Sequence, residues 1–208
     1  MLSKVAEADF PSEYGHFRIY GFERRELGMP EAEEAVVLKL GTVTGPPPLV
    51  RVHSECLTGD VFHSLRCDCR AQLELALVQI GAAGRGLLIY EKKEGRGIGL
   101  MNKLRAYQLQ DEGADTVEAN ERLGFESDLR DYELPASILK YLGVTKIRLL
   151  SNNPHKVQAM EDSGVEVVER VPCIAPEAET RAAYLHTKRV KMGHFLEESP
   201  TGSGDGTV

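Results

Sequence analysis

The chain has 208 residues, 42% of them hydrophobic, so it can bury the core of one ordinary domain and is not disordered as a whole. Its 25 basic and 32 acidic residues give a formal net charge of −7. This charge excludes a general nucleic-acid binder, because a polyanion requires a basic surface. No apolar run approaches the roughly 18 residues of a membrane span, and the N-terminus lacks the apolar segment of a signal peptide. We therefore expect a cytoplasmic protein with no membrane partner, whose four cysteines are metal ligands or free thiols.

Short apolar runs bounded by glycine and charged residues predict strands in the first half of the chain, at 17–23 and 36–41. A Pro-rich connector at 45–50 leads into the strand-like run VRVH. In the second half, apolar residues at helical spacing predict a helix at about 70–83 that Gly84 ends. After it we predict a strand at 86–90 and a helix near 98–112 that Gly113 stops. A further helix is marked by Leu134, Ile138, Leu139 and Leu142. The last predicted unit is βαβ-like, with a strand at 147–150, a short helix from Pro154 and a strand at 165–168.

This order of elements predicts the fold class. We expect an α/β protein with a single domain over 1–194, in which a mixed β-sheet is flanked by helices. The N-terminal part is β-rich and the C-terminal part is βαβ-like. The segment 195–208 is rich in Gly, Ser and Thr without an apolar anchor, and we expect it to be a disordered tail.

Three cysteines lie within 14 residues, in the pattern C-x10-C-x-C formed by Cys56, Cys67 and Cys69. Thiolates are preferred zinc ligands, and three protein ligands leave one coordination position open for water, as in catalytic sites. The spacing also allows a structural zinc site with His53 or His63 as a fourth ligand, or three buried thiols without a metal. Cys173 lies in an apolar run and is expected to be a core residue.

The tripeptide His53-Ser54-Glu55 matches the H-x-E half of the zinc nucleotide deaminases, but the P-C-x-x-C half is missing. A deaminase fold is therefore not expected. Glu55 is so close to a candidate ligand that it is either an acid/base or metal-ligating carboxylate or only a surface charge.

Residues 92–105 form a basic, Gly-rich loop with five basic residues and one acidic residue. Glycines permit close backbone approach, and the loop opens a helix whose free N–H groups attract anions, so it could hold a triphosphate. It fits neither the P-loop nor the dinucleotide motif, and it could also be only a solvated loop. Ser151 to Pro154 are expected to end a strand and cap a helix, in whose first turn Lys156 opposes the helix dipole. A cation in this position usually has a partner such as phosphate, but the same pattern also fits a helix that is only well capped.

Six longer motifs resemble those of the GTP cyclohydrolase II family in its stand-alone form. They are RVHSECLTGD (51–60), SLRCDC (64–69), EGRGIGLMNKLRAY (94–107), DTVEAN (115–120), RLLSNNP (148–154) and TKRVKMGH (187–194). The resemblance covers roughly 10–194. It implies hydrolysis of GTP to formate, pyrophosphate and 2,5-diamino-6-ribosylamino-4(3H)-pyrimidinone 5′-phosphate, the first step of riboflavin biosynthesis. It also implies one Zn²⁺ per subunit, Mg²⁺ with the triphosphate, and a homodimer.

The resemblance assigns roles to residues of this chain. It implies that zinc is bound by Cys56, Cys67 and Cys69 and that catalysis involves Asp128, Arg130 and Tyr107. It implies that GTP is bound by Arg51, Val52, His53, Ser54, Glu55, Gln72, Glu94, Gly95, Arg96, Thr116, Ser151 and Lys156. Ser151 replaces the threonine of many relatives but keeps the hydroxyl, and Gly97 replaces a bulkier residue of some relatives.

Two questions stay open from the sequence. Arg130 matches the family's proposed nucleophile, yet a guanidinium has a pKa above about 12 and is normally a charge clamp for phosphoryl groups. Asp128, which matches the proton acceptor, could hold Arg130 or act as its base. The alternatives for the whole protein are a zinc-containing sensor that binds GTP without turnover, and a cyclohydrolase that stops at a formylated intermediate or serves another heterocycle pathway.

Overall fold

A computed structural model describes residues 1–26, 28, 31–125, 130–174, 188–191 and 193–195. Within these ranges one sheet has the strand order β1-β2-β3-β5-β4-β6-β7. The pairs β1–β2, β2–β3 and β3–β5 are antiparallel, whereas β5–β4, β4–β6 and β6–β7 are parallel. The strands are β1 (Leu2–Ser12), β2 (Gly15–Arg24), β3 (Glu33–Leu40), β4 (Leu49–Ser54), β5 (Gly86–Glu91), β6 (Lys146–Leu150) and β7 (Glu166–Val171). The sheet is mixed, as predicted.

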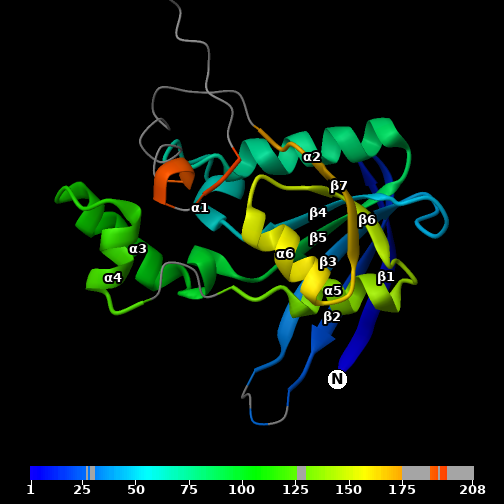
Figure 1. Ribbon diagram of the computed structural model, residues 1–208, viewed down its shortest axis with the longest axis horizontal. Helices are drawn as coiled ribbons and strands as arrows, with labels where there is room; N and C mark the ends of the chain where they lie inside the picture. The colour runs from blue at the N-terminus through cyan, green and yellow to red at the C-terminus, as the bar shows by residue number, and fades with distance from the viewer. Residues whose placement is uncertain (27, 29–30, 126–129, 175–187, 192, 196–208) are drawn as a thin grey trace, which may run out of the picture.

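Helices cover both faces of this sheet (Figure 1). Helix α2 (Cys69–Ala83) packs Ala76 and Ile80 against one face, where they meet Phe17 and Leu88. Helices α5 (Glu133–Tyr141) and α6 (Pro154–Asp162) cover the other face with a larger apolar cluster. Strands β4 and β5 are buried on both sides, which is typical of parallel strands between helical layers. The layered α/β fold predicted from the sequence is therefore confirmed.

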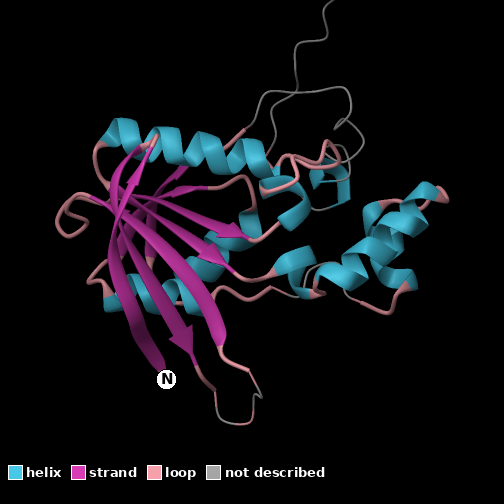
Figure 2. Cartoon of the chain, turned by 180° about the vertical axis from the view of Figure 1, so that it is seen from behind, coloured by secondary structure: helices cyan, strands magenta, loops and turns pink. Residues whose placement is uncertain are grey.

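The remaining helices lie beyond the ends of the parallel strands. They are α1 (Leu57–Asp60), the 3₁₀ turn η1 (Glu94–Gly97), α3 (Leu100–Asp111) and α4 (Thr116–Arg122). Figure 2 shows α3 and α4 extending to one side of the sheet. Alanines of α3 and α4 form a small separate apolar cluster. The loops that follow β4 and β5 lead directly into α1 and η1, so the functional motifs gather at one edge of the sheet.

Most predicted elements are present, with changed boundaries. The predicted helix at 70–83 is α2, and Gly84 ends it in the left-handed conformation at φ +65°. The βαβ-like unit is β6, α6 and β7. No sequence pattern predicted β1, α1 or α4. No helix in the described ranges is long and apolar enough to cross a membrane. Of the predicted tail, only Phe195 is described, and its N–H donates to the carbonyl of Asn152.

Candidate active site

A pocket opens where the parallel strands β4, β5 and β6 end, the usual position of a binding site in an α/β sheet. Although the chain is acidic, the described residues that line the pocket include eight Lys or Arg and only two carboxylates. The basic residues are Arg51, Arg66, Lys93, Arg96, Lys103, Arg130, Lys156 and Lys188. A pocket with this charge suits a polyanionic ligand.

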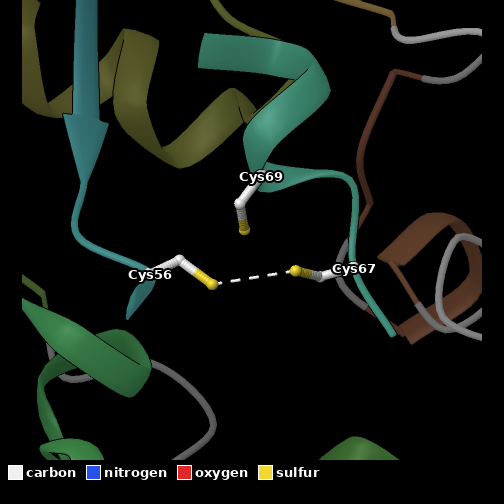
Figure 3. A group of neighbouring side chains, drawn as sticks. All are labelled: Cys56, Cys67 and Cys69. Carbon is white, nitrogen blue, oxygen red and sulfur yellow. Dashed lines mark hydrogen bonds between the residues drawn. The ribbon is translucent and has the colours of Figure 1, made fainter. Parts of the chain in front are cut away.

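Cys56, Cys67 and Cys69 face one another at one side of this pocket (Figure 3). Cys56 follows β4, and Cys67 and Cys69 lie at the start of α2. Their sulfurs all lie within 4.8 Å of one another, and those of Cys56 and Cys67 are 3.7 Å apart. Two sulfurs bound to one tetrahedral zinc at about 2.3 Å are separated by roughly 3.8 Å, so this arrangement fits a zinc ion.

The surroundings of the cluster also favour a cation. Hydrogen bonds with the Cys67 and Cys69 thiols, together with the Lys103 ammonium, lower the pKa of the Cys56 thiol. Hydrogen bonds to Cys56, together with burial, raise the pKa of the Cys67 and Cys69 thiols. One thiolate therefore forms readily, whereas three thiolates together require a positive ion between them.

Two histidines, His53 and His63, were considered as a fourth ligand. Among the described residues, neither of them belongs to the group formed by the three cysteines. His53 is buried on β4, and its Nε2 lies 3.1 Å from a carboxylate oxygen of Asp60. Burial lowers the pKa of His53, and Asp60 also accepts from the N–H of Cys56 and the hydroxyl of Tyr90. His63 is exposed. His53 therefore orients the chain around Cys56 through Asp60.

A chain of buried polar contacts runs behind the cysteines. The Lys188 ammonium donates to Asp68 at 2.7 Å, and the Gln72 amide donates to the other Asp68 oxygen. Gln72 Oε1 accepts from Arg51 at 2.6 Å, and Arg51 also donates to the carbonyl of Leu150. Asp68 stands between two of the clustered cysteines, so these contacts fix the turn that carries them.

The basic loop forms a tight turn at η1. Gly95 has a φ of +61°, and Arg96, which carries a side chain, has a φ of +60° and is in a sparsely populated conformation. The Glu94 carboxylate holds this turn, because it accepts from the N–H groups of Gly95 and Leu57 and from the Lys103 ammonium. The loop is thereby fixed beside the cysteines rather than loosely solvated.

The β6–α6 turn forms another wall of the pocket. Asn153 caps α6 by accepting from the N–H of His155, and Pro154 occupies the first turn, as predicted. The hydroxyl of Ser151 accepts from the N–H of Asn153. Lys156 is buried, donates to the carbonyl of Val52 at 2.8 Å and lies 5.0 Å from the centroid of the Tyr132 ring. These contacts hold the Lys156 ammonium at the pocket wall.

The pocket brings together most of the residues to which the family resemblance assigned GTP binding or catalysis. It is lined by Arg51, His53, Ser54, Glu55, Gln72, Glu94, Gly95, Arg96, Tyr107, Arg130, Ser151 and Lys156. Val52 has a fully buried side chain in the core, and only its carbonyl reaches Lys156. Thr116 is the first residue of α4, whose N-terminus Asp115 caps. Asp128 lies outside the described residues.

Several pocket residues were not assigned a role from the sequence, among them Lys103, Lys188 and His194. His194 Nε2 is buried and has no hydrogen-bond partner in the described part of the chain. Burial and the charges of Lys188, Arg96 and Arg130 lower the pKa of His194 to about 3, so its imidazole is neutral near pH 7. The motifs 94–107 and 187–194 contained these residues, but spacing alone did not show which of them face the pocket.

Comparison with known proteins identifies the family of this chain. The family model "GTP cyclohydrolase II" matches residues 3–172. The chain is 52% identical over 201 residues to the GTP cyclohydrolase-2 of Klebsiella pneumoniae, covering 96% of this chain and 98% of the relative. It is 54% identical over 197 residues to that of Histophilus somni, covering 94% and 89%. It is also 52% identical to the riboflavin biosynthesis protein RibBA of Bacillus cytotoxicus, over 94% of this chain and 48% of that protein. The chain therefore belongs to the GTP cyclohydrolase II family.

Proposed function

We propose that this protein is a zinc-dependent GTP cyclohydrolase II that catalyses the first step of riboflavin biosynthesis. It opens the imidazole ring of GTP at C8, releases formate and pyrophosphate, and leaves 2,5-diamino-6-ribosylamino-4(3H)-pyrimidinone 5′-phosphate. One observation supports this reaction above all: three cysteines at zinc-ligand spacing lie in the wall of a pocket whose other walls are strongly basic. Hydrolysis of a purine nucleoside triphosphate at C8 requires both features. The basic walls bind the anionic phosphates, and the metal that the cysteines would hold activates water for attack on C8, which is a weak electrophile.

The three thiolates would hold one zinc ion per subunit. When bound, zinc acts as a Lewis acid that activates water at neutral pH, which attack on C8 requires. The side chains that line the pocket would orient the purine beside the three thiolates. Glu55 lines the same pocket, and burial and the nearby Glu94 carboxylate raise its pKa. In this proposal Glu55 and Tyr107 contact the purine and guide proton transfer at the ring.

The basic residues bind and orient the triphosphate. Lys156, Arg96 and Arg130 line the pocket, and the Arg130 guanidinium donates to the Ser54 hydroxyl at 3.5 Å. Mg²⁺ would accompany the phosphate oxygens rather than occupy a protein cage. Arg130 either clamps the α-phosphate or attacks it, with Asp128 as its partner, and in both cases the loss of Arg130 should stop pyrophosphate release. The family resemblance further supports a homodimer.

The decisive experiment measures formate and pyrophosphate released from GTP by zinc-loaded and by chelator-treated protein, while the guanine absorbance is followed. We expect both products and loss of the guanine chromophore with zinc, and recovery of formate release when zinc is returned to the stripped protein. Zinc-loaded protein that binds GTP and leaves the chromophore intact would instead be a sensor. Loss of the chromophore without formate would identify a cyclohydrolase that stops at the formylated intermediate.

A further inference from the structure

The Lys103 ammonium joins the cysteine cluster to the carboxylate of Glu94. Lys103 Nζ donates to Cys56 Sγ at 3.1 Å and to Glu94 Oε1 at 2.7 Å. The side chains of Lys103 and Glu94 are only 11% and 8% exposed, so water screens this pair weakly. Lys103 lies on α3, whereas Cys56 follows β4, 47 residues earlier. The contact therefore connects two elements that are distant in the sequence.

The Glu94 carboxylate also contacts the backbone next to Cys56. Its Oε2 accepts from the N–H of Leu57 at 2.7 Å, and Leu57 directly follows Cys56. Its Oε1 accepts from the N–H of Gly95 at 2.8 Å in the turn of the basic loop. Cys56 is thus fixed twice, at its sulfur by Lys103 and at the adjacent backbone by Glu94.

The charges around the metal site explain why a positively charged side chain is needed beside Cys56. Three thiolates around one divalent ion leave a net charge of −1, and the carboxylate of Glu94 adds a second negative charge nearby. The largely buried Lys103 side chain places its ammonium where it compensates for part of this charge. A hydrogen bond to a ligand sulfur also fixes the direction of that ligand. Contacts of this kind around a metal site typically change metal affinity about 10- to 100-fold.

We infer that Lys103 is a positioning residue of the metal centre, which orients Cys56, compensates for the charge of the three thiolates and couples the centre to the η1 turn through Glu94. The inference rests on the zinc site of the proposed function. A purely structural alternative is that Lys103 only pairs with Glu94 to pack α3 against η1. The two differ in whether the metal itself responds to the loss of the ammonium.

The experiment uses the full-length protein and two substitutions, Lys103→Leu and Lys103→Arg. The zinc dissociation constant is measured by competition with a chromophoric chelator, and the thiolate-to-metal charge-transfer band is measured with Co²⁺ in place of zinc. Lys103→Leu should weaken zinc binding about 10- to 100-fold and shift the cobalt band. Lys103→Arg should restore part of the affinity. Lys92→Leu is the matched control, because Lys92 is exposed and pairs with Glu34 away from the pocket.

Glu94→Gln tests the coupling. It removes the charge that holds Lys103, so it should weaken zinc binding in the parent protein and add little when Lys103 is already leucine. Circular dichroism and thermal melting of each variant show that it is folded. A folded Lys103→Leu protein with the parental zinc affinity and an unchanged cobalt band would overturn the inference alone. A parent protein that binds neither metal would overturn the proposed zinc site, and the inference with it.

Discussion

The hydroxyl oxygen of Tyr107 lies 3.2 Å from that of Thr58, and the Thr58 hydroxyl lies 3.7 Å from the sulfur of Cys56. Tyr107 therefore belongs to the cysteine side of the pocket and not only to the packing of α3. Burial raises its pKa, so the phenol stays protonated near pH 7 and can donate a hydrogen bond or a proton.

Tyr107→Phe should slow formate release by at least about 100-fold, because it removes one group that can transfer a proton and keeps the ring. GTP binding should change little, since the basic residues remain. Formate assays and equilibrium binding of GTP measure the two effects separately. Tyr141→Phe is the control, because Tyr141 is 54% exposed and packs against Phe22. Formate release at the parental rate would show that Tyr107 is only a packing residue.

Cys67→Ser should abolish formate release and spare the phosphate chemistry. Serine is barely ionised near pH 7, so the protein should lose zinc, and activation of water by zinc corresponds to roughly 12 kcal/mol of differential stabilisation. The folded variant should still cleave GTP slowly to GMP and pyrophosphate. Chromatography of the products and metal analysis measure both effects. Cys173→Ala, at a buried cysteine outside the cluster, should keep zinc and formate release.

The sequence predicted those elements whose apolar pattern is regular and whose ends carry a strong signal. Helix α2 has both, since its apolar residues repeat at helical spacing and Gly84 adopts the left-handed conformation that stops it. Strand β1 has neither. Most of its residues are exposed, because among the described strands it pairs with β2 alone, at the edge of the sheet. No apolar alternation therefore marks it.

The site was predictable to the extent that it is local in the sequence. The three cysteines lie within 14 residues, so their spacing alone suggested that they meet. The contacts that hold them are not local: Lys103 reaches Cys56 across 47 residues, and Lys188 reaches Asp68 across 120. Such contacts depend on how α3 and the C-terminal segment pack, which no short pattern encodes.

Glu91→Gln should stabilise the protein at alkaline pH. Glu91 is fully buried at the end of β5, and neither carboxylate oxygen has a hydrogen-bond partner among the described residues. Burial raises the pKa of Glu91 to about 7, although Lys156, Lys93 and Arg130 oppose this shift. The folded protein thus holds a proton that the unfolded chain releases near pH 4.5. The free energy of unfolding therefore falls as the pH rises from about 4.5 to 7 and stays low above it.

Glutamine keeps the shape of Glu91 and removes this titration. At pH 8 the free energy of unfolding of the variant should exceed that of the parent by on the order of 1 to 3 kcal/mol. Near pH 4.5 the two free energies should differ little. Urea denaturation at the two pH values measures it. Glu34→Gln, at a half-exposed residue of β3, should show no such pH-dependent gain. Equal unfolding free energies of the Glu91 variant and the parent at pH 8 would contradict the prediction.

Gly59→Ala should fold but fail to bind zinc. Gly59 lies in α1 and is not among the glycines with positive φ, so alanine fits the backbone and favours the helix by about 1 kcal/mol. A Cβ at this position would lie 2.8 Å from Cys67 Sγ and 3.1 Å from both Cys56 Sγ and Cys69 Cβ. Without a metal, the thiols can rotate away from the new methyl group. To bind a metal, the three sulfurs must point toward one ion, and the methyl group of alanine would prevent this arrangement.

Metal analysis and chelator competition on the Gly59→Ala protein test this steric argument, with circular dichroism to show that it is folded. Gly21→Ala is the matched control, because its Cβ would meet only the backbone nitrogen of Ala6, at 4.0 Å. The control should retain zinc, whereas the Gly59 variant should lose most of it and, with it, formate release. Since no ligand is removed, such a loss would come from the space around the sulfurs alone. Full zinc content in a folded Gly59→Ala protein would mean that the ion is not held between these three sulfurs.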